Sequence, residues 1–191
     1  RFEDPVDFVL AIDGRDNSRL LVQERYEVLR AMFYHETHDA DAYLDPPDAD
    51  TPLFKPIDLM LQTATPLLMG NWKASSETYE TGDLAYGNAN PAAPDYDSLA
   101  DFIFAGDYVE LKLPWQLLNF SDPSRMTIHD DYYENYGVDY ITIDTMHLGL
   151  TDGAAQERTP LYPAALKGWG NTVSYHERLK PSYYILQKLW Q

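Results

Sequence analysis

Carboxylate side chains are the most abundant groups in this sequence that could do chemistry. Asp130, Asp131 and Glu134 lie close together in one short segment. Glycoside hydrolysis needs two carboxyl groups, one on each side of the scissile bond. This segment could supply such a pair, and Asp139 with Asp144 could supply another. Because the chain holds 31 acidic residues, plausible pairs also arise by chance. A carboxylate-pair hydrolase therefore remains an alternative.

Two loops contain the oxygen ligands that calcium prefers. The first loop carries Asp45, Asp48 and Asp50, and the second, at 13–17, carries two aspartates and an asparagine. Neither loop follows the spacing of an EF-hand. Ordinary turn aspartates also explain both loops, because aspartate is favoured in turns. The sequence therefore predicts no obligatory cofactor and leaves calcium binding open.

Other catalytic signatures are incomplete. His35 and His38 are one position too close together for the H-E-x-x-H pattern of zinc hydrolases. The chain has no cysteine, which excludes disulfides, thiolate metal sites and cysteine nucleophiles. No G-x-S-x-G elbow, phosphate-binding loop or dinucleotide fingerprint occurs.

Aromatic residues are numerous, with 15 tyrosines and 4 tryptophans, and several lie in polar segments. Sugar rings stack on aromatic planes, while neighbouring carboxylates and amides bond the hydroxyl groups. We therefore predict that these loop aromatics bind a ligand: Trp72, Trp169, Tyr132, Tyr133 and Tyr136. The alternative is that the tyrosines pack the edges of the fold.

The net charge of −17 limits the kinds of partner. A surface that binds nucleic acid needs a basic patch, and the sequence contains none. No stretch approaches the roughly 20 apolar residues of a membrane-spanning helix, so we expect no membrane insertion.

The elements that would position these residues are mostly short strands. Residues 6–13 place Val6, Phe8, Leu10 and Ile12 on one face at period two, and Val9 and Ala11 make the other face partly apolar. Residues 19–23 can return as a hairpin partner across a turn at 14–17. Similar patterns predict strands at 57–61, 99–104, 108–113 and 140–150, a hairpin over 77–86 that turns at Gly82-Asp83, and loops at 35–56, 87–97 and 121–139. A C-terminal helix is predicted over 182–191.

Many short strands with turn residues between them favour a mainly β fold. We expect an antiparallel β-sandwich, jelly-roll-like, with long loops and a C-terminal helix. No composition break divides the chain, so 1–191 is interpreted as a single domain. Because it begins at Arg1 without a leader pattern, we interpret it as a fragment of a longer protein.

One motif is specific. Glu110, Leu113, Pro114, Trp115 and Leu118 match the pattern E-x-x-[IL]-P-W-x-x-L. This pattern resembles the signature of the DOMON-like superfamily, which includes the family 9 carbohydrate-binding modules. In that family a strand ends at Pro-Trp. Proline ends a strand ladder because it has no N–H to donate.

The resemblance extends to the opening strands at 8–22. The closing segment at 175–184 is similar to the C-terminal end of large exported bacterial proteins, in which a sandwich follows a glycosidase-like region. These resemblances imply a non-catalytic accessory domain that is extracellular or at the bacterial cell surface. Its expected partner is a polysaccharide or an N-terminal catalytic domain of the same chain. A hydrolase domain and a purely structural domain without a ligand remain the alternatives.

Overall fold

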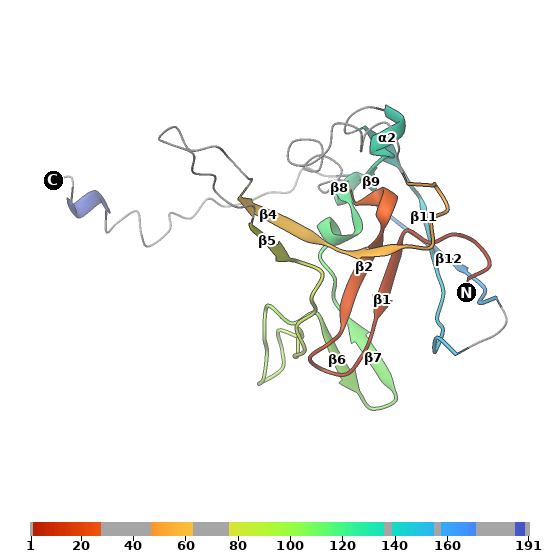
Figure 1. Cartoon of the computed structure of the whole chain (residues 1–191). Coiled ribbons are helices and arrows are strands. Elements are labelled where there is room, and N and C mark those ends of the chain that lie inside the picture. Colours follow the sequence, from red (N-terminus) through yellow and green to blue (C-terminus); the bar gives the residue numbers. More distant parts are fainter. Residues whose placement is uncertain are drawn as a thin grey trace.

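The computed structural model describes residues 2–27, 47–62, 77–135, 139–154, 158–170 and 186–189. In these ranges the strands form two three-stranded and three two-stranded sheets, and every strand pairing is antiparallel. The predicted mainly β class is therefore confirmed. The strands are short because turns interrupt the chain every few residues (Figure 1).

The N-terminal sheet contains β1 (Phe8–Ala11), β2 (Arg19–Gln23) and β3 (Phe54–Pro56), with β2 in the centre. The predicted hairpin of the first two strands is confirmed. Leu20 and Val22, on one face of β2, are almost fully buried. A 3-10 helix, η1 (Glu24–Tyr26), follows β2 directly.

The third strand of this sheet corrects the prediction that 35–56 is a loop throughout. Phe54–Pro56 pairs with the free edge of β2. An open strand edge presents unpaired N–H and C=O groups, which a short extended segment can satisfy. Pro56 lies at the end of this edge strand, where a proline is tolerated.

The predicted hairpin over 77–86 is wrong. β5 (Glu77–Glu80) pairs instead with β4 (Asp58–Gln62), which confirms a strand near 57–61. Beyond β5 the chain runs along β2, where the Leu20 amide donates to the Gly82 carbonyl at 2.8 Å. A Cβ atom at Gly82 would collide with the Leu20 carbonyl. Gly82 therefore permits a close approach of two segments and does not form the tip of a hairpin.

β6 (Phe102–Ala105) and β7 (Tyr108–Leu111) form a tight hairpin that turns at Gly106, which has a φ of 65°. After β7, Pro114 precedes the 3-10 helix η3 (Trp115–Leu118). The Trp115 ring packs on Phe120 with centroids 4.7 Å apart. The strand before the Pro-Trp motif ends at Leu111, and the 3-10 helix begins at Trp115.

The segment 121–139, predicted to be a loop, contains regular structure, so that prediction is wrong. β8 (Phe120–Asp122), the 3-10 helix η4 (Pro123–Arg125), β9 (Thr127–His129) and the short helix α2 (Tyr132–Asn135) follow one another. β9 is the central strand between β8 and β10 (Tyr140–Thr142). Three-residue strands are too short to show a clear alternation in the sequence.

The long strand predicted over 140–150 is also wrong, because the chain changes sheets within it. After β10, the amide of Ile143 donates to Met126, and β11 (Thr145–Leu148) then pairs with β12 (Tyr162–Ala165). Apolar and β-branched residues continue through the junction, so composition alone does not reveal the break.

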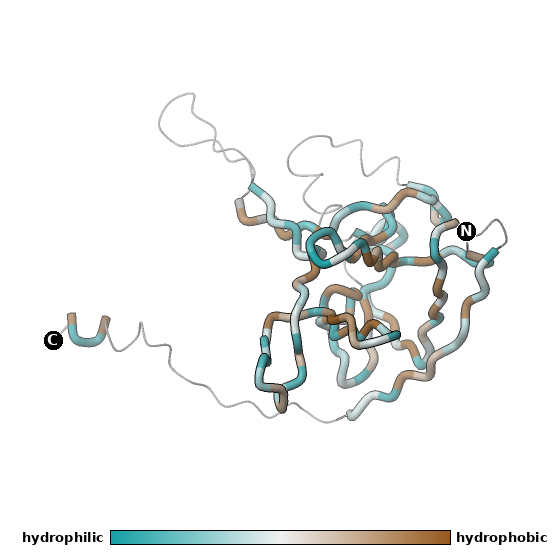
Figure 2. The backbone as a smooth tube through the Cα atoms, turned by 90° about the horizontal axis from the view of Figure 1, so that it is seen from below, coloured by the Kyte–Doolittle hydropathy of each residue, from teal (hydrophilic) through white to brown (hydrophobic). Residues whose placement is uncertain are grey.

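Few side chains are fully buried among the described residues. Seven hydrophobic residues form the core, whereas nineteen large hydrophobic side chains are exposed. Hydrophobic positions are spread over most of the described backbone (Figure 2). Residues 186–189 are helical, within the helix predicted over 182–191. No helix in the described ranges has the length and apolar character needed to cross a membrane.

Candidate functional site

A buried ion pair connects η1 with the start of α2. The side chain of Arg25 donates through Nε to Asp131 Oδ2 at 2.6 Å, and through Nη1 to the Pro47 carbonyl at 2.7 Å. Arg25 and Asp131 are 9% and 8% exposed. Arg25 reaches this position because η1 begins where the buried strand β2 ends. We call Arg25, Asp131, Tyr133 and Glu134 the Arg25 cluster.

Three of the carboxylates predicted as catalytic candidates, Asp130, Asp131 and Glu134, lie in or beside this cluster. Asp131 accepts from Arg25 through Oδ2 and from the Tyr133 amide through Oδ1 at 3.0 Å. Asp130 Oδ1 accepts from the Asp131 amide at 2.8 Å. The Glu134 side chain is 72% exposed and lies 3.9 Å from Arg25 Nη2. Because both oxygens of Asp131 are engaged, that carboxylate is better suited to holding η1 against α2 than to attacking a substrate.

Two of the predicted tyrosines are on α2, beside the same arginine. The Tyr133 ring centre lies 5.7 Å from Arg25 Cζ, in a cation–π arrangement, and its ring meets that of Tyr132 edge-on at 6.2 Å. Burial is the main cause that raises the pKa of Tyr133 above its ordinary value, with a smaller contribution from Glu27. The Tyr133 hydroxyl therefore stays protonated at neutral pH. Tyr136 lies outside the described residues.

Trp169 lies elsewhere, on a segment that packs against η4. Gly170 donates its amide to the Ser124 carbonyl at 2.9 Å, and a Cβ atom at Gly168 would come within 2.5 Å of that oxygen. Ser124 is itself held by Asp122, whose side chain accepts from the Ser124 hydroxyl at 2.6 Å. That hydrogen bond is the main cause that lowers the pKa of Asp122.

The indole of Trp169 is 47% exposed although its backbone is anchored on both sides. η4 precedes β9 and α2 follows it, so Trp169 and the Arg25 cluster belong to opposite ends of that strand. Trp169 therefore lies on a different segment from Tyr132 and Tyr133. Trp72 lies outside the described residues.

The predicted calcium loop is described only in part. Asp45 is outside the described ranges, and Asp48 accepts from the Thr51 amide at 3.1 Å through its backbone carbonyl, as in a turn. Asp50 lies in the same turn. Within the described ranges, no group of three or more histidine, aspartate or glutamate side chains could hold a metal ion. A site that includes Asp45 stays a prediction.

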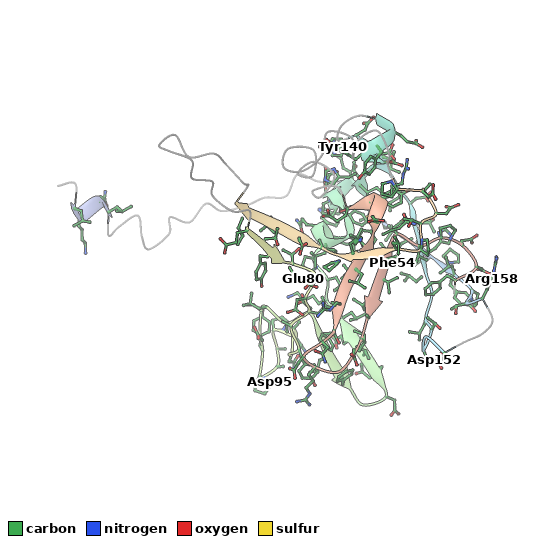
Figure 3. The ribbon with its side chains drawn as sticks, viewed as in Figure 1. Phe54, Glu80, Asp95, Tyr140, Asp152 and Arg158 are labelled. Carbon is green, nitrogen blue, oxygen red and sulfur yellow. The ribbon has the colours of Figure 1, made fainter. Side chains whose placement is uncertain are left out.

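Sequence reasoning missed Arg25 and His129. Arg25 lies in a polar segment without clear periodicity, so nothing marked it as buried. His129, on β9, stacks against Tyr140 with ring centres 5.1 Å apart. Its Nδ1 is buried and finds no hydrogen-bond partner among the described residues. Burial also lowers the pKa of His129. Tyr140 lies at the α2 end of the molecule (Figure 3).

Comparisons of this chain with models of known protein families, with curated proteins and with solved structures found no match. Only the residues of this chain and their geometry bear on its function.

Proposed function

We propose that this chain is a non-catalytic accessory domain of a secreted bacterial protein that acts on polysaccharide. In this proposal its small sheets belong to a jelly-roll-like sandwich, and it binds carbohydrate through Trp169. The observation that carries the proposal is the half-exposed indole on a backbone that Gly168 and Gly170 anchor to Ser124. A sugar ring can stack on such a plane.

The anchoring matters for affinity. A side chain that is ordered before binding loses less conformational entropy when the ligand arrives. The close approach of Gly168 to the Ser124 carbonyl leaves little room for the segment to move inward. The backbone that carries Trp169 is thus held against η4 before a ligand arrives.

The engaged carboxylates support a non-catalytic role. Retaining and inverting glycosidases both need a carboxyl group that is free to give or take a proton. Asp131 is occupied by Arg25 and the Tyr133 amide, and Asp130 bonds the Asp131 amide. Of the three carboxylates in this segment, Glu134, whose side chain is exposed, is the one left for a hydrolase. That alternative predicts glycoside turnover by the isolated chain.

A glycan array on the 191-residue chain tests the proposal. We expect specific retention that Trp169→Ala lowers at least about tenfold and that Trp169→Phe partly restores, because a ring still stacks. Tyr162→Ala is the matched control, since Tyr162 is also exposed but lies on β12. Running the array with and without calcium tests whether glycan binding depends on calcium, as a calcium site at Asp45, Asp48 and Asp50 would predict. Retention that survives both Trp72→Ala and Trp169→Ala would contradict the assignment.

A second accessory role is packing against a neighbouring catalytic domain. The observation in its favour is the excess of exposed over buried hydrophobic side chains in the described ranges, nineteen large ones against seven. Exposed apolar side chains mark an interaction surface where they gather into one contiguous patch. A silent array from a folded chain would favour this packing role or a structural domain without a ligand.

A further inference from the structure

An arginine of η4 lies next to the segment that carries the exposed indole. We call Gly168, Trp169 and Gly170 the Trp169 segment. The Gly170 amide donates to the Ser124 carbonyl, and a Cβ atom at Gly168 would lie 3.4 Å from the Cα atom of Arg125. The two glycines on either side of the tryptophan therefore both contact the backbone of η4. These contacts fix the backbone of Arg125 beside the Trp169 segment.

The Arg125 guanidinium keeps its hydrogen-bonding capacity for a ligand. Its side chain is 75% exposed, and its only ion-pair partner among the described residues is Asp122, whose Oδ2 lies 3.7 Å from Nε. That separation is beyond hydrogen-bond distance. The other carboxylate oxygen of Asp122 accepts from the hydroxyl and the amide of Ser124. Because an exposed ion pair of this length contributes little, an incoming anion can compete for the guanidinium.

A second cation precedes the Trp169 segment. Lys167 is exposed and makes no ion pair or hydrogen bond within the described part of the chain. The carboxylate of Asp144, whose carbonyl accepts from the neighbouring Leu166 amide, accepts from the Thr145 hydroxyl. Several other cations are paired with groups of the protein itself: Arg19 with Glu80, Arg25 with Asp131, Lys55 with Glu24, and Arg15 with the Tyr86 ring. In a chain of net charge −17, the exposed indole therefore has two available cations nearby.

We propose that the Trp169 segment and Arg125 together bind a sugar that carries a carboxylate, such as a uronic acid. This inference rests on the carbohydrate binding proposed above, for which it names the class of sugar. The sugar ring stacks on the indole, and the planar guanidinium donates two parallel hydrogen bonds to the carboxylate. The Lys167 ammonium adds a second positive charge. A neutral sugar would stack equally well but would gain no charge-assisted hydrogen bond.

The overall charge of the protein favours a short acidic ligand over a long one. A net charge of −17 repels an extended polyanion, most of which lies outside the site. At about 0.15 M salt, interactions between exposed charges are largely screened beyond about 8 Å. A short oligosaccharide therefore interacts mainly with the groups that it contacts, and the test uses ligands of this kind.

Titration calorimetry on the 191-residue chain tests the class of sugar. The probes are short oligosaccharides of galacturonate, glucuronate and mannuronate, each as the free acid and as the methyl ester. The two forms share the same ring and differ in charge. A chelator is present, so that calcium cannot bridge a ligand carboxylate to an aspartate. We expect at least one acid to bind at least about tenfold more tightly than its ester, and Trp169→Ala to weaken both forms.

Variants of Arg125 locate the recognition of the carboxylate. Arg125→Gln should weaken binding of the acid at least about tenfold and change binding of the ester less than about twofold. Arg125→Lys keeps the charge but loses the planar fork, so it should retain part of the preference. Arg158→Gln is the matched control, because Arg158 is also exposed and has no ion pair or hydrogen bond within the described ranges. It changes the net charge equally and should alter the affinity for the acid less than about twofold.

Each contrary outcome has a distinct meaning. If no acid binds more tightly than its ester, while Trp169→Ala still abolishes glycan retention on the array, carbohydrate binding stands and the acidic class of sugar is wrong. If Arg125→Gln and Arg158→Gln weaken binding of the acid equally, the preference comes from overall charge and recognition by Arg125 is contradicted. If neither the calorimetry nor the array detects a glycan, the inference and the proposed carbohydrate binding are both contradicted.

Discussion

Arg25 and Asp131 form a charge-assisted hydrogen bond of 2.6 Å although they are 106 positions apart in the chain. Both side chains are about nine-tenths buried. The pair joins the end of the N-terminal sheet to the start of α2, and the same carboxylate also accepts from the Tyr133 amide. It is therefore a structural connection between two halves of the described fold.

Removing one partner of this pair should strongly destabilise the protein. Asp131→Ala would leave the Arg25 guanidinium buried without its counter-charge, and we expect a loss of about 3–5 kcal/mol in the free energy of unfolding. Urea unfolding followed by circular dichroism measures the change. Glu134→Ala is the control. Its side chain is exposed and its carboxylate lies as far as 3.9 Å from the Arg25 guanidinium, so the loss in the free energy of unfolding should stay below about 1 kcal/mol. Similar losses for the two variants would contradict a structural role specific to Asp131.

His129 should make stability depend on pH below neutrality. Burial lowers its pKa in the folded state below the ordinary value of 6.5. As the pH falls below 6.5, the unfolded state takes up the proton first, so the free energy of unfolding decreases until the pH reaches the folded pKa. His129→Phe, which cannot be protonated, should flatten this slope.

Urea unfolding of both proteins between about pH 5 and about pH 8 measures that slope. His147→Gln is the control, because His147 is exposed on β11. A wild-type slope that persists unchanged in His129→Phe would show that other groups cause the pH dependence.

Gly168→Ala should disturb the segment that carries Trp169. The added Cβ would lie 2.5 Å from the Ser124 carbonyl, so the segment must shift and the bond from the Gly170 amide weakens. We expect a loss of about 1–3 kcal/mol and faster hydrogen exchange of the Gly170 amide. Gly153→Ala separates sterics from backbone strain, because its Cβ would meet nothing within 4 Å and its φ is 77°. If hydrogen exchange of the Gly170 amide is unchanged in Gly168→Ala, the Ser124 carbonyl does not anchor the segment that carries Trp169.

The turn of the β6–β7 hairpin needs a left-handed residue at Gly106. Its φ of 65° is costly for alanine, so Gly106→Ala should lose about 1 kcal/mol. Gly106→Asn should lose less, since asparagine tolerates this conformation better. The midpoint temperature of thermal unfolding should be highest for the wild type, lower for Gly106→Asn and lowest for Gly106→Ala. Equal losses for alanine and asparagine would point to a cause other than backbone conformation.

The hairpin of β1 and β2 could be predicted from the sequence, and pairings between distant segments could not. These two strands are neighbours in the chain, so an apolar face at period two and a turn signal are enough. β5 pairs with β4 rather than with the residues after Gly82, because that part of the chain runs along β2. Such a choice depends on which strand edges other segments leave open.

The candidate site was predicted unevenly for the same reason. Tyr132, Tyr133 and the nearby carboxylates stood out by residue type, and the structure places them in or beside the Arg25 cluster. Their organising residue, Arg25, is far away in the chain and has no distinctive neighbours. Trp169 was also singled out, but the contact of its segment with Ser124 could not be predicted, because the two are far apart in the chain.

By itself, the sequence determined the strongly acidic character of the protein, its mainly β class and the hairpin of β1 and β2. These properties follow from composition and from alternation along a few residues. Only the tertiary structure decided that Asp131 is committed to Arg25 and that the segment of Trp169 packs on η4. Burial and ion pairing depend on contacts between segments that are distant in the chain, and local side-chain patterns do not encode those contacts.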